Sequence, residues 1–494
     1  MKSCFRTSAV CLLLAASAFS QVVPQRRSVL AHKPEKPPAR FFPYPIYEKT
    51  LANGLRILIV PTPEFKDMVS YTMPVFAGSR NETEKGKTGL AHLFEHIMFR
   101  HEYEGVPGGY TAMMNRLGTY NNAFTTYDFT FYHPFTFTRN LIGPVATPQG
   151  PTPGVIELEA SRFKGLKMDQ RTFQVEAGAV LGEYRRIYSF PAQKMIEQMS
   201  PIAFPHHPYG HTVIGYLDDV EKMPQAWDAA WQFFHNYYTP NDTALIVVGD
   251  VNPHKLFPAI EKAYADWKPV PTPKIPALAE PKEHRPVHVD WEAEVAPRLV
   301  VAYHTPAFSP GTPESAVALV LDELLTSRSA PLFQKLRYQK QSVTSFTTFM
   351  APISTDPHWM LLAAELSLER FQKEGTKYVD EVRYDIVNGT EALKNFSQDP
   401  NAARTLEVIK SKVKNDFLAQ WDTTDHIAQS LATYYRFNRD PHVLDTLLQS
   451  VDELQPTDID EYASKYFTRE GRLVGTLWHG PPPPETAPKK TEAR

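Results

Sequence analysis

The sequence predicts an α+β protein made of two related domains, and three observations support this fold class. The chain has 494 residues, which is more than one hydrophobic core usually serves. The segment WKPVPTPKIPALAEPKEHRP at 267–286 carries six prolines and is typical of a semi-rigid linker. On either side of it, a candidate strand, LRILIV at 55–60 or RLVVAYH at 298–304, leads into apolar helical stretches.

The proline-rich segments also set the boundaries that we predict along the chain. We expect a signal peptide at 1–20, an extended leader at 21–44, a first domain at 45–266, a linker at 267–286, a second domain at 287–480 and a disordered tail at 481–494. Both domains mix strands and helices, and this shared pattern indicates an old duplication, although the two halves share little at the level of single residues.

The N-terminus has the pattern of a secretory signal peptide. Lys2 and Arg6 precede an apolar run that falls short of the roughly 20 residues a membrane span needs, and the tripeptide at 18–20 resembles a cleavage site. The alternative is a short N-terminal helix of the mature protein. Cys4 and Cys11 both lie in this segment, so the mature chain would have neither disulfides nor thiolate metal ligands.

The composition indicates a globular protein, and the net charge does not indicate a protein that binds nucleic acid or anionic membranes. Apolar residues make up 42% and charged residues 22% of the chain, which is typical of a globular protein. A formal net charge of −3 gives no reason to expect binding to nucleic acid or to an anionic membrane. Because no later apolar run is long enough to cross a bilayer, we expect a secreted, periplasmic protein without a stable membrane span.

The segment GLAHLFEHIMFR at 89–100 carries the chemistry of the first half. On a helix, His92 and His96 stand four residues apart on one face, where both imidazoles can meet one ion. Glu95 is rotated aside, which suits a general base better than a third ligand. Zinc fits nitrogen and carboxylate donors of this kind. The alternative is an ordinary core helix that contains two hydrogen-bonded histidines.

A third ligand is expected from a separate element. The segment QVEAGAVLGEYRRIYSF at 174–190 places Glu176 and Glu183 seven residues apart, on one face of a helix. A solvated pair of surface carboxylates is the alternative. The apolar companions of the two glutamates predict a helix that is at least partly buried; these are Val175, Val180, Leu181 and Ile187.

One competing motif can be set aside. The GKT at 86–88 would bind phosphate only in a P-loop, which requires a glycine five residues before the GK pair. That position is occupied by Asn81, and the surrounding pattern is not strand, loop and helix.

The H-x-x-E-H spacing is the inverzincin motif, and here the chain resembles the M16 family of pitrilysin- and insulinase-like metallopeptidases. It is most similar to the half-length members, which include the mitochondrial processing peptidase subunits. The resemblance extends over roughly 45–480 and rests on five blocks: VFAGSRNETEKGKTGLAHLFEHIMF at 75–99, GTYNNAFTTYDFTFY at 118–132, EAGAVLGE at 176–183, HPYGHTVIG at 207–215 and YYTPNDTALIVVGDV at 237–251. It implies two LuxS/MPP-like domains, each a mostly antiparallel sheet packed with helices.

The resemblance also implies roles for particular residues. It makes His92, His96 and Glu183 the ligands of one Zn²⁺ per chain and Glu95 the general base, while Glu176 orients a ligand. Asn122 and Ala123 would lie on a strand edge that binds an extended peptide by main-chain hydrogen bonds. The gap between His96 and Glu183 is about ten residues longer than usual in the family, and the proline-rich segment 140–154 is the expected surface-loop insertion.

The second half lacks a metal motif. Its equivalent of the zinc helix is ESAVALVLDELLT at 314–326, without histidines. Family members contribute from this half an arginine and, seven residues later, a tyrosine that reach the substrate. Arg337 stands at the arginine position, but Thr344 replaces the tyrosine and lacks the reach of a phenol. The resemblance therefore implies a heterodimer, in which a related subunit supplies the arginine and tyrosine pair.

Together these observations predict an exported zinc metalloendopeptidase that cleaves peptides or unfolded polypeptides. Two alternatives remain open at this point. The chain is a non-catalytic scaffold or peptide-binding subunit of the same family, or it captures peptides in a closed chamber with little turnover. Metal content and peptide cleavage distinguish these three possibilities.

Overall fold

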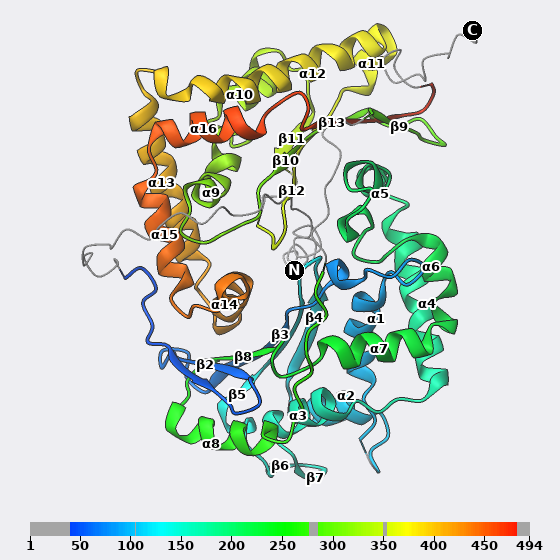
Figure 1. The fold of residues 1–494 in the computed structure, drawn as a ribbon, viewed down its shortest axis with the longest axis vertical. Coiled ribbons are helices and arrows are strands. Elements are labelled where there is room, and N and C mark those ends of the chain that lie inside the picture. The colour runs from blue at the N-terminus through cyan, green and yellow to red at the C-terminus, as the bar shows by residue number, and fades with distance from the viewer. Residues whose placement is uncertain (1–39, 104, 276–284, 349–352, 482–494) are drawn as a thin grey trace, which may run out of the picture.

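Two large sheets and the helices packed on them make up most of the part of the chain that the structure describes. The computed structural model describes residues 40–103, 105–275, 285–348 and 353–481. In Figure 1 the first half of the chain forms the lower body and the second half most of the upper one. The predicted signal peptide at 1–20, most of the leader, the middle of the proline-rich linker and residues 482–494 of the tail lie outside the described residues.

The elements of the first half are β1 (Tyr47–Thr50), β2 (Arg56–Pro61), β3 (Met68–Val75), η2 (Ser79–Asn81), α1 (Leu90–Ile97), η3 (Met98–Arg100), α2 (Gly109–Arg116), β4 (Tyr120–Thr125), β5 (Thr130–Phe137), β6 (Val145–Thr147), β7 (Gly150–Thr152), α3 (Val155–Gly165), α4 (Gln170–Ile187), α5 (Pro191–Ala203), α6 (Leu217–Lys222), α7 (Trp227–Tyr237), β8 (Ala244–Gly249) and α8 (Pro253–Tyr264).

The elements of the second half are β9 (Val287–Asp290), β10 (Arg298–Thr305), α9 (Pro313–Leu325), α10 (Pro331–Gln334), the π-helical turn η7 (Lys335–Gln339), β11 (Ser345–Thr348), β12 (His358–Glu365), α11 (Leu368–Glu374), α12 (Thr376–Glu391), α13 (Ala402–Ala419), α14 (Thr424–Asn438), α15 (Val443–Glu453), α16 (Pro456–Tyr466) and β13 (Arg472–Trp478).

Both sheets are mostly antiparallel, as predicted. The first has the strand order β1-β2-β8-β3-β5-β4 and the second the order β11-β12-β10-β13-β9. The parallel pairs are β2 with β8 and β13 with β9. The buried strands are rich in branched apolar residues, as in the ALIVVG of β8, which is buried at every position. The α+β fold class is therefore confirmed.

Each half lends one helix to the sheet of the other half. Helix α14 of the second half packs against β3 and β8 of the first sheet, and α5 of the first half packs against β9 and β13 of the second. Ile427 and Leu431 of α14 share a buried cluster with Leu58 and Ile246 of the first sheet. Because these apolar surfaces lie between the halves, separating the domains would expose them to water.

The described end of the leader also packs on the second half. The backbone amide of Phe42 donates to Asp445 Oδ1 at 2.8 Å, and the Phe42 ring meets that of Trp421 edge to face at 5.1 Å. Phe42 is only 2% exposed. The N-terminal segment thus contacts helices from the far end of the chain.

One local expectation needs correction. The insertion at 140–154 is not a plain loop, because residues 145–147 and 150–152 pair as the two-stranded hairpin β6–β7. The prediction of a partly buried helix at 174–190 is confirmed, with Val180 buried, although Val175 of the same helix is 62% exposed. The helix period alone does not show where the buried face of α4 ends, because the residues that cover this face come from other parts of the chain.

Candidate metal centre

Helix α1 presents the two histidines of the H-x-x-E-H motif side by side. Its apolar face is buried against α7, where Phe94 stacks on Phe234 with 5.4 Å between ring centroids. The rings of His92 and His96 project from another face of α1, with centroids 5.0 Å apart and planes at 77°. The four-residue spacing therefore places both imidazoles at one spot, as the helix period requires.

Glu183 of α4 completes a group of three. Its Oε2 lies 3.4 Å from His92 Nε2 and 3.7 Å from His96 Nε2. One ligand atom from each residue lies within 4.8 Å of the others, and no further group of three such residues occurs within the described ranges. Helices α1 and α4 pack directly on each other, which brings residues that are far apart in the sequence into contact.

The donor set fits a zinc ion in spacing and in donor type. Bonds of about 2.0–2.1 Å in a tetrahedron place ligand atoms roughly 3.3 Å apart, close to the two distances from Glu183. Two imidazoles and a carboxylate are donors that zinc accepts in proteins. The Glu183 side chain is 36% exposed, so the group is open to solvent on that side.

Glu176 lies behind His96. Its Oε2 is 3.5 Å from His96 Nδ1, the nitrogen that faces away from Glu183, and its Oε1 accepts a 2.7 Å hydrogen bond from Arg100 Nε. A carboxylate in this place fixes the orientation of a ligating imidazole. His92 differs, because its Nδ1 is buried without a hydrogen-bond partner among the residues that the structure describes.

The ionisable groups of the cluster influence each other strongly. Burial opposes a charge on His96, but the hydrogen bonds to Glu176 and Glu183 outweigh it and raise the pKa of His96 to about 9. Burial lowers the pKa of His92. The hydrogen bond with His96 lowers the pKa of Glu183, and that of Glu176 is also lowered, because the same histidine and Arg100 overcome the effect of its burial. Both carboxylates are therefore held ionised.

Glu95 lies beside the three ligand candidates without belonging to them. Its Oε2 is 3.9 Å from His92 Nε2 and accepts a 2.7 Å hydrogen bond from Thr125 Oγ1 at the end of β4. One carboxylate oxygen is thus fixed by an edge strand of the sheet.

The predicted peptide-binding residues lie on that same edge strand. Strand β4 is the last in the order of the first sheet and packs against α1. Asn122 is exposed and donates to Tyr120 Oη at 3.1 Å, whereas Ala123 is buried. The strand places an edge of the sheet next to the metal centre, as β-strand addition of a peptide requires.

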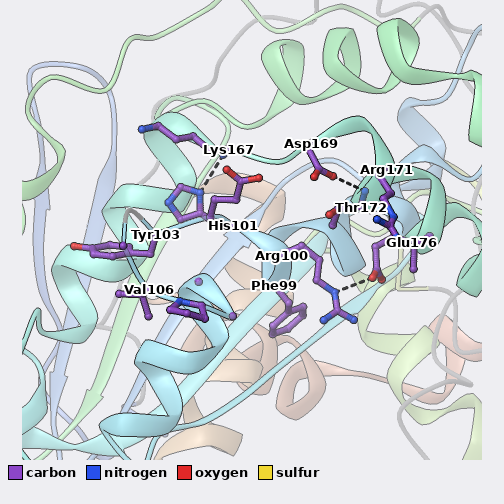
Figure 2. Close-up of a pocket in the computed structure, with 16 residues that line it drawn as sticks. Phe99, Arg100, His101, Tyr103, Val106, Lys167, Asp169, Arg171, Thr172 and Glu176 are labelled. Atoms are coloured by element: carbon purple, nitrogen blue, oxygen red, sulfur yellow. Dashed lines mark hydrogen bonds and ion pairs between the residues drawn. The ribbon is translucent and has the colours of Figure 1, made fainter. Parts of the chain in front are cut away.

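A cavity of about 1100 Å³ opens beside the metal centre (Figure 2). Arg100 and Glu176 form the wall that the cavity shares with the centre, and Figure 2 shows their ion pair at its margin. Apolar and polar side chains both line the rest, among them Phe99, Tyr103, Val106, Lys167 and Arg171.

Arg337 and Thr344 are held within the second half. Arg337 Nη1 donates to the Val343 carbonyl at 3.3 Å, within its own segment. Thr344 Oγ1 donates to the Glu365 carbonyl at 3.1 Å. In the described part of the chain neither residue is recorded in contact with the metal centre, so the structure does not bring this pair of sequence-predicted residues together with the motif.

Two contributors to the site were missed at the level of sequence. Arg100 follows His96 by four residues, and this spacing could have indicated that it shares the face of α1. Thr125 gave no local signal, because its contact with Glu95 depends on how β4 packs against α1.

Comparison with known families agrees with this geometry. The model of the insulinase-type M16 peptidase family matches residues 58–216, and the model of the M16 inactive domain matches residues 228–382. Together the two matches span more than half of the chain. The chain belongs to the M16 peptidase family.

Similar proteins from other organisms extend over most of this M16 chain. The zinc protease PqqE of Helicobacter pylori is 27% identical over 438 residues, covering 85% of this chain and 89% of that protein. A crystal structure of a protease from H. pylori superposes with a TM-score of 0.73 at 26% identity, covering 88% of this chain and 99% of that one. The mitochondrial-processing peptidase subunit beta of Lentinula edodes is 21% identical, covering 85% of this chain and 86% of that protein.

Proposed function

We propose that this M16 chain is a zinc metalloendopeptidase that cleaves peptides or unfolded polypeptides. The observation that carries the proposal is the convergence of His92 Nε2, His96 Nε2 and Glu183 Oε2 from two packed helices, with the Glu95 carboxylate beside them. The name of the H. pylori relative, a zinc protease, supports the same metal and the same class of reaction.

The residues present suit peptide hydrolysis. A zinc ion held by His92, His96 and Glu183 would supply a Lewis acid that polarises the scissile carbonyl and makes water more acidic. Glu95 takes the proton of the attacking water and returns it to the leaving amine. The edge of β4, at Asn122 and Ala123, orients an extended chain by backbone hydrogen bonds. The adjoining cavity of about 1100 Å³ leaves room for side chains of that chain.

Metal analysis together with one substitution tests this proposal. We expect about one zinc per chain and cleavage of an unfolded polypeptide that stops when a chelator removes the metal. Glu95→Gln should keep the zinc and lose cleavage by roughly 100-fold or more, because general-base catalysis typically contributes that much. Glu261→Gln on α8, an exposed glutamate paired with Lys49, is the matched control. A wild-type chain without zinc, or a Glu95→Gln variant with full activity, would contradict the proposal.

Thr344 favours a two-subunit enzyme. A threonine in place of the tyrosine shortens the reach of the second half toward a substrate carbonyl, and Arg337 is bound to its own segment. We propose a heterodimer in which a related M16 subunit supplies the arginine and tyrosine pair. The resemblance of the chain to a mitochondrial-processing peptidase subunit supports this arrangement.

Purification from the native source tests the heterodimer. A related subunit without the complete zinc motif should co-purify with this chain, and peptide cleavage should depend on both chains. Full turnover by a homodimer of this chain alone contradicts the heterodimer but leaves the zinc peptidase intact. A complex that contains zinc and binds unfolded peptides but cleaves none would favour the non-catalytic alternative.

The N-terminal sequence supports export to the periplasm. No helix in the described ranges combines the length and apolar character needed to cross a bilayer. We propose that the chain is processed near residue 20 and acts outside the cytoplasm. Sequencing of the mature N-terminus after cell fractionation tests both points, and a cytoplasmic chain that begins at residue 1 would contradict them.

A further inference from the structure

Helix α1 carries three residues of the metal centre on only eight residues, Leu90–Ile97. Helices this short are unstable by themselves, because few of their backbone groups are paired within the helix. The position of His92, Glu95 and His96 must therefore be fixed by contacts at the ends and sides of α1.

The N-terminus of α1 has no capping side chain of its own. The N-cap residue is Gly89, whose φ of 87° is in the left-handed region. A Cβ atom at this position would lie 2.3 Å from the Ile214 carbonyl oxygen. The serine, threonine or aspartate that usually caps a helix is thus excluded here, and the first amide groups need acceptors from elsewhere.

Glu82 supplies those acceptors from the loop after η2. Its Oε2 accepts from the Gly89 amide and its Oε1 from the Ala91 amide, both at 2.7 Å. The Glu82 side chain is fully buried, and the imidazole of His211 lies 3.8 Å away. Burial raises the pKa of Glu82 to about 8, so the cap rests on its two acceptor oxygens rather than on a full negative charge at the positive end of the helix dipole.

A buried cation meets the opposite end of α1. Arg162 of α3 is 0% exposed, and its Nη1 donates to the carbonyl of Met98, the C-cap residue, at 3.3 Å. Its Nη2 donates to Glu159 at 2.8 Å, which balances the buried charge. The guanidinium also lies 4.3 Å from the ring centroid of Tyr110. This cation stands at the negative end of the same helix dipole.

We propose that Glu82 and Arg162 are positioning residues that clamp the two ends of α1 and thereby fix His92, Glu95 and His96 relative to Glu183. Glu82 binds the residue immediately before His92, and Arg162 binds the residue two after His96. Release of either end allows α1 to shift or fray by a fraction of an ångström, which is enough to alter the angle between two ligand atoms of one ion. This inference rests on the proposed metal centre for its functional consequence.

The experiment compares Glu82→Gln with Glu84→Gln in the full chain. The side-chain amide in Glu82→Gln would keep one acceptor oxygen but turn an NH₂ group toward a backbone amide of α1. Glu84→Gln is the control, because Glu84 is an exposed residue of the same loop that pairs with Lys87. Amide exchange of the metal-free proteins reports on residues 89–98 without any metal. Zinc competition and the visible spectrum of the cobalt-substituted proteins report on ligand geometry, which a contribution to overall stability alone would not change.

We expect amide exchange at 89–98 to accelerate about tenfold in Glu82→Gln while exchange in the second domain stays unchanged. Zinc should bind roughly tenfold to 100-fold more weakly, as when other groups that orient metal ligands are removed, and the cobalt spectrum should shift. Glu84→Gln should match the wild type. If Glu82→Gln does not fold, Glu82→Asp, which keeps the carboxyl group but cannot reach both amides, takes its place, and Arg162→Lys tests the other end.

Unchanged exchange at 89–98 together with an unchanged cobalt spectrum in Glu82→Gln would overturn the clamp. A wild-type chain that binds no zinc would overturn the proposed function instead. In that case the exchange experiment still decides whether Glu82 holds α1.

Discussion

Thr125 Oγ1 donates a 2.7 Å hydrogen bond to Glu95 Oε2. The donor ends an edge strand and the acceptor belongs to helix α1, so this single contact links the strand on which we expect a peptide to lie to the carboxylate that we propose as general base. It leaves the other oxygen of Glu95 free of this constraint. The proposed general base is therefore oriented by the same strand that we expect to orient the substrate.

Replacing Thr125 with valine should lower kcat by roughly tenfold, because the carboxylate of Glu95 keeps its charge but loses its fixed orientation. Zinc content should not change, since Thr125 contacts no ligand candidate. Steady-state kinetics with a peptide substrate and metal analysis check both points. Thr50→Val, an exposed threonine on the strand at the opposite edge of the same sheet, should behave like the wild type. An unchanged kcat in Thr125→Val would show that the hydrogen bond does not contribute to catalysis.

Glu176→Gln should weaken zinc binding roughly tenfold to 100-fold, because the carboxylate that orients His96 through Nδ1 becomes a neutral amide. Competition with a chromophoric chelator measures this change. Glu221→Gln on α6, whose partner is the exposed Arg185, is the control. Zinc affinity equal to that of the wild type would mean that Glu176 serves only to bind Arg100.

Thr344→Tyr should raise peptide turnover by the isolated chain, because a phenol restores the reach that the threonine lacks. Thr344 is exposed, so the larger side chain can be accommodated. Thr347→Tyr, three residues further on, in β11, controls for the addition of an aromatic ring. If both variants turn over substrate at the wild-type rate, Thr344 is not what limits the isolated chain.

The stability of the protein should fall in mild acid, and His358 should account for about one proton of that effect. Burial, with His304 and His207 nearby, holds the pKa of His358 well below its ordinary value. Below about pH 6.5 the unfolded chain binds a proton at this histidine and the folded chain does not, so the free energy of unfolding drops by about 1.4 kcal/mol per pH unit. His358→Phe should reduce this slope in denaturant titrations between about pH 5 and 6.5.

The control for His358 is His426→Phe, because His426 is an exposed histidine that pairs with Asp422 on the solvent side of α14. It should leave the slope nearly unchanged. Equal slopes for His358→Phe and the wild type would show that His358 is charged in the folded protein.

Much of the fold was accessible from local pattern. The apolar runs at 55–60 and 298–304 predicted strands, and β2 and β10 occupy those positions. The spacing of Glu176 and Glu183 predicted one helix face, and both lie on α4. The helix period did not predict which apolar side chains are buried, because residues that are distant in the sequence cover them. Val175 has the same apolar character as the buried Val180, but it is exposed at the wall of the cavity.

The sequence by itself determined that His92, Glu95 and His96 share a helix, since the 3.6-residue period acts over a few neighbouring positions. It also determined the fold class and, through the family blocks, the kind of chemistry to expect. Only the tertiary structure decided that α4 brings Glu183 to within 3.4 Å of His92 and that Thr125 fixes Glu95. The contacts of Glu82 and Arg162 with the ends of α1 could not be predicted from the sequence either. These contacts depend on long-range packing between buried surfaces, for which no short-range period exists.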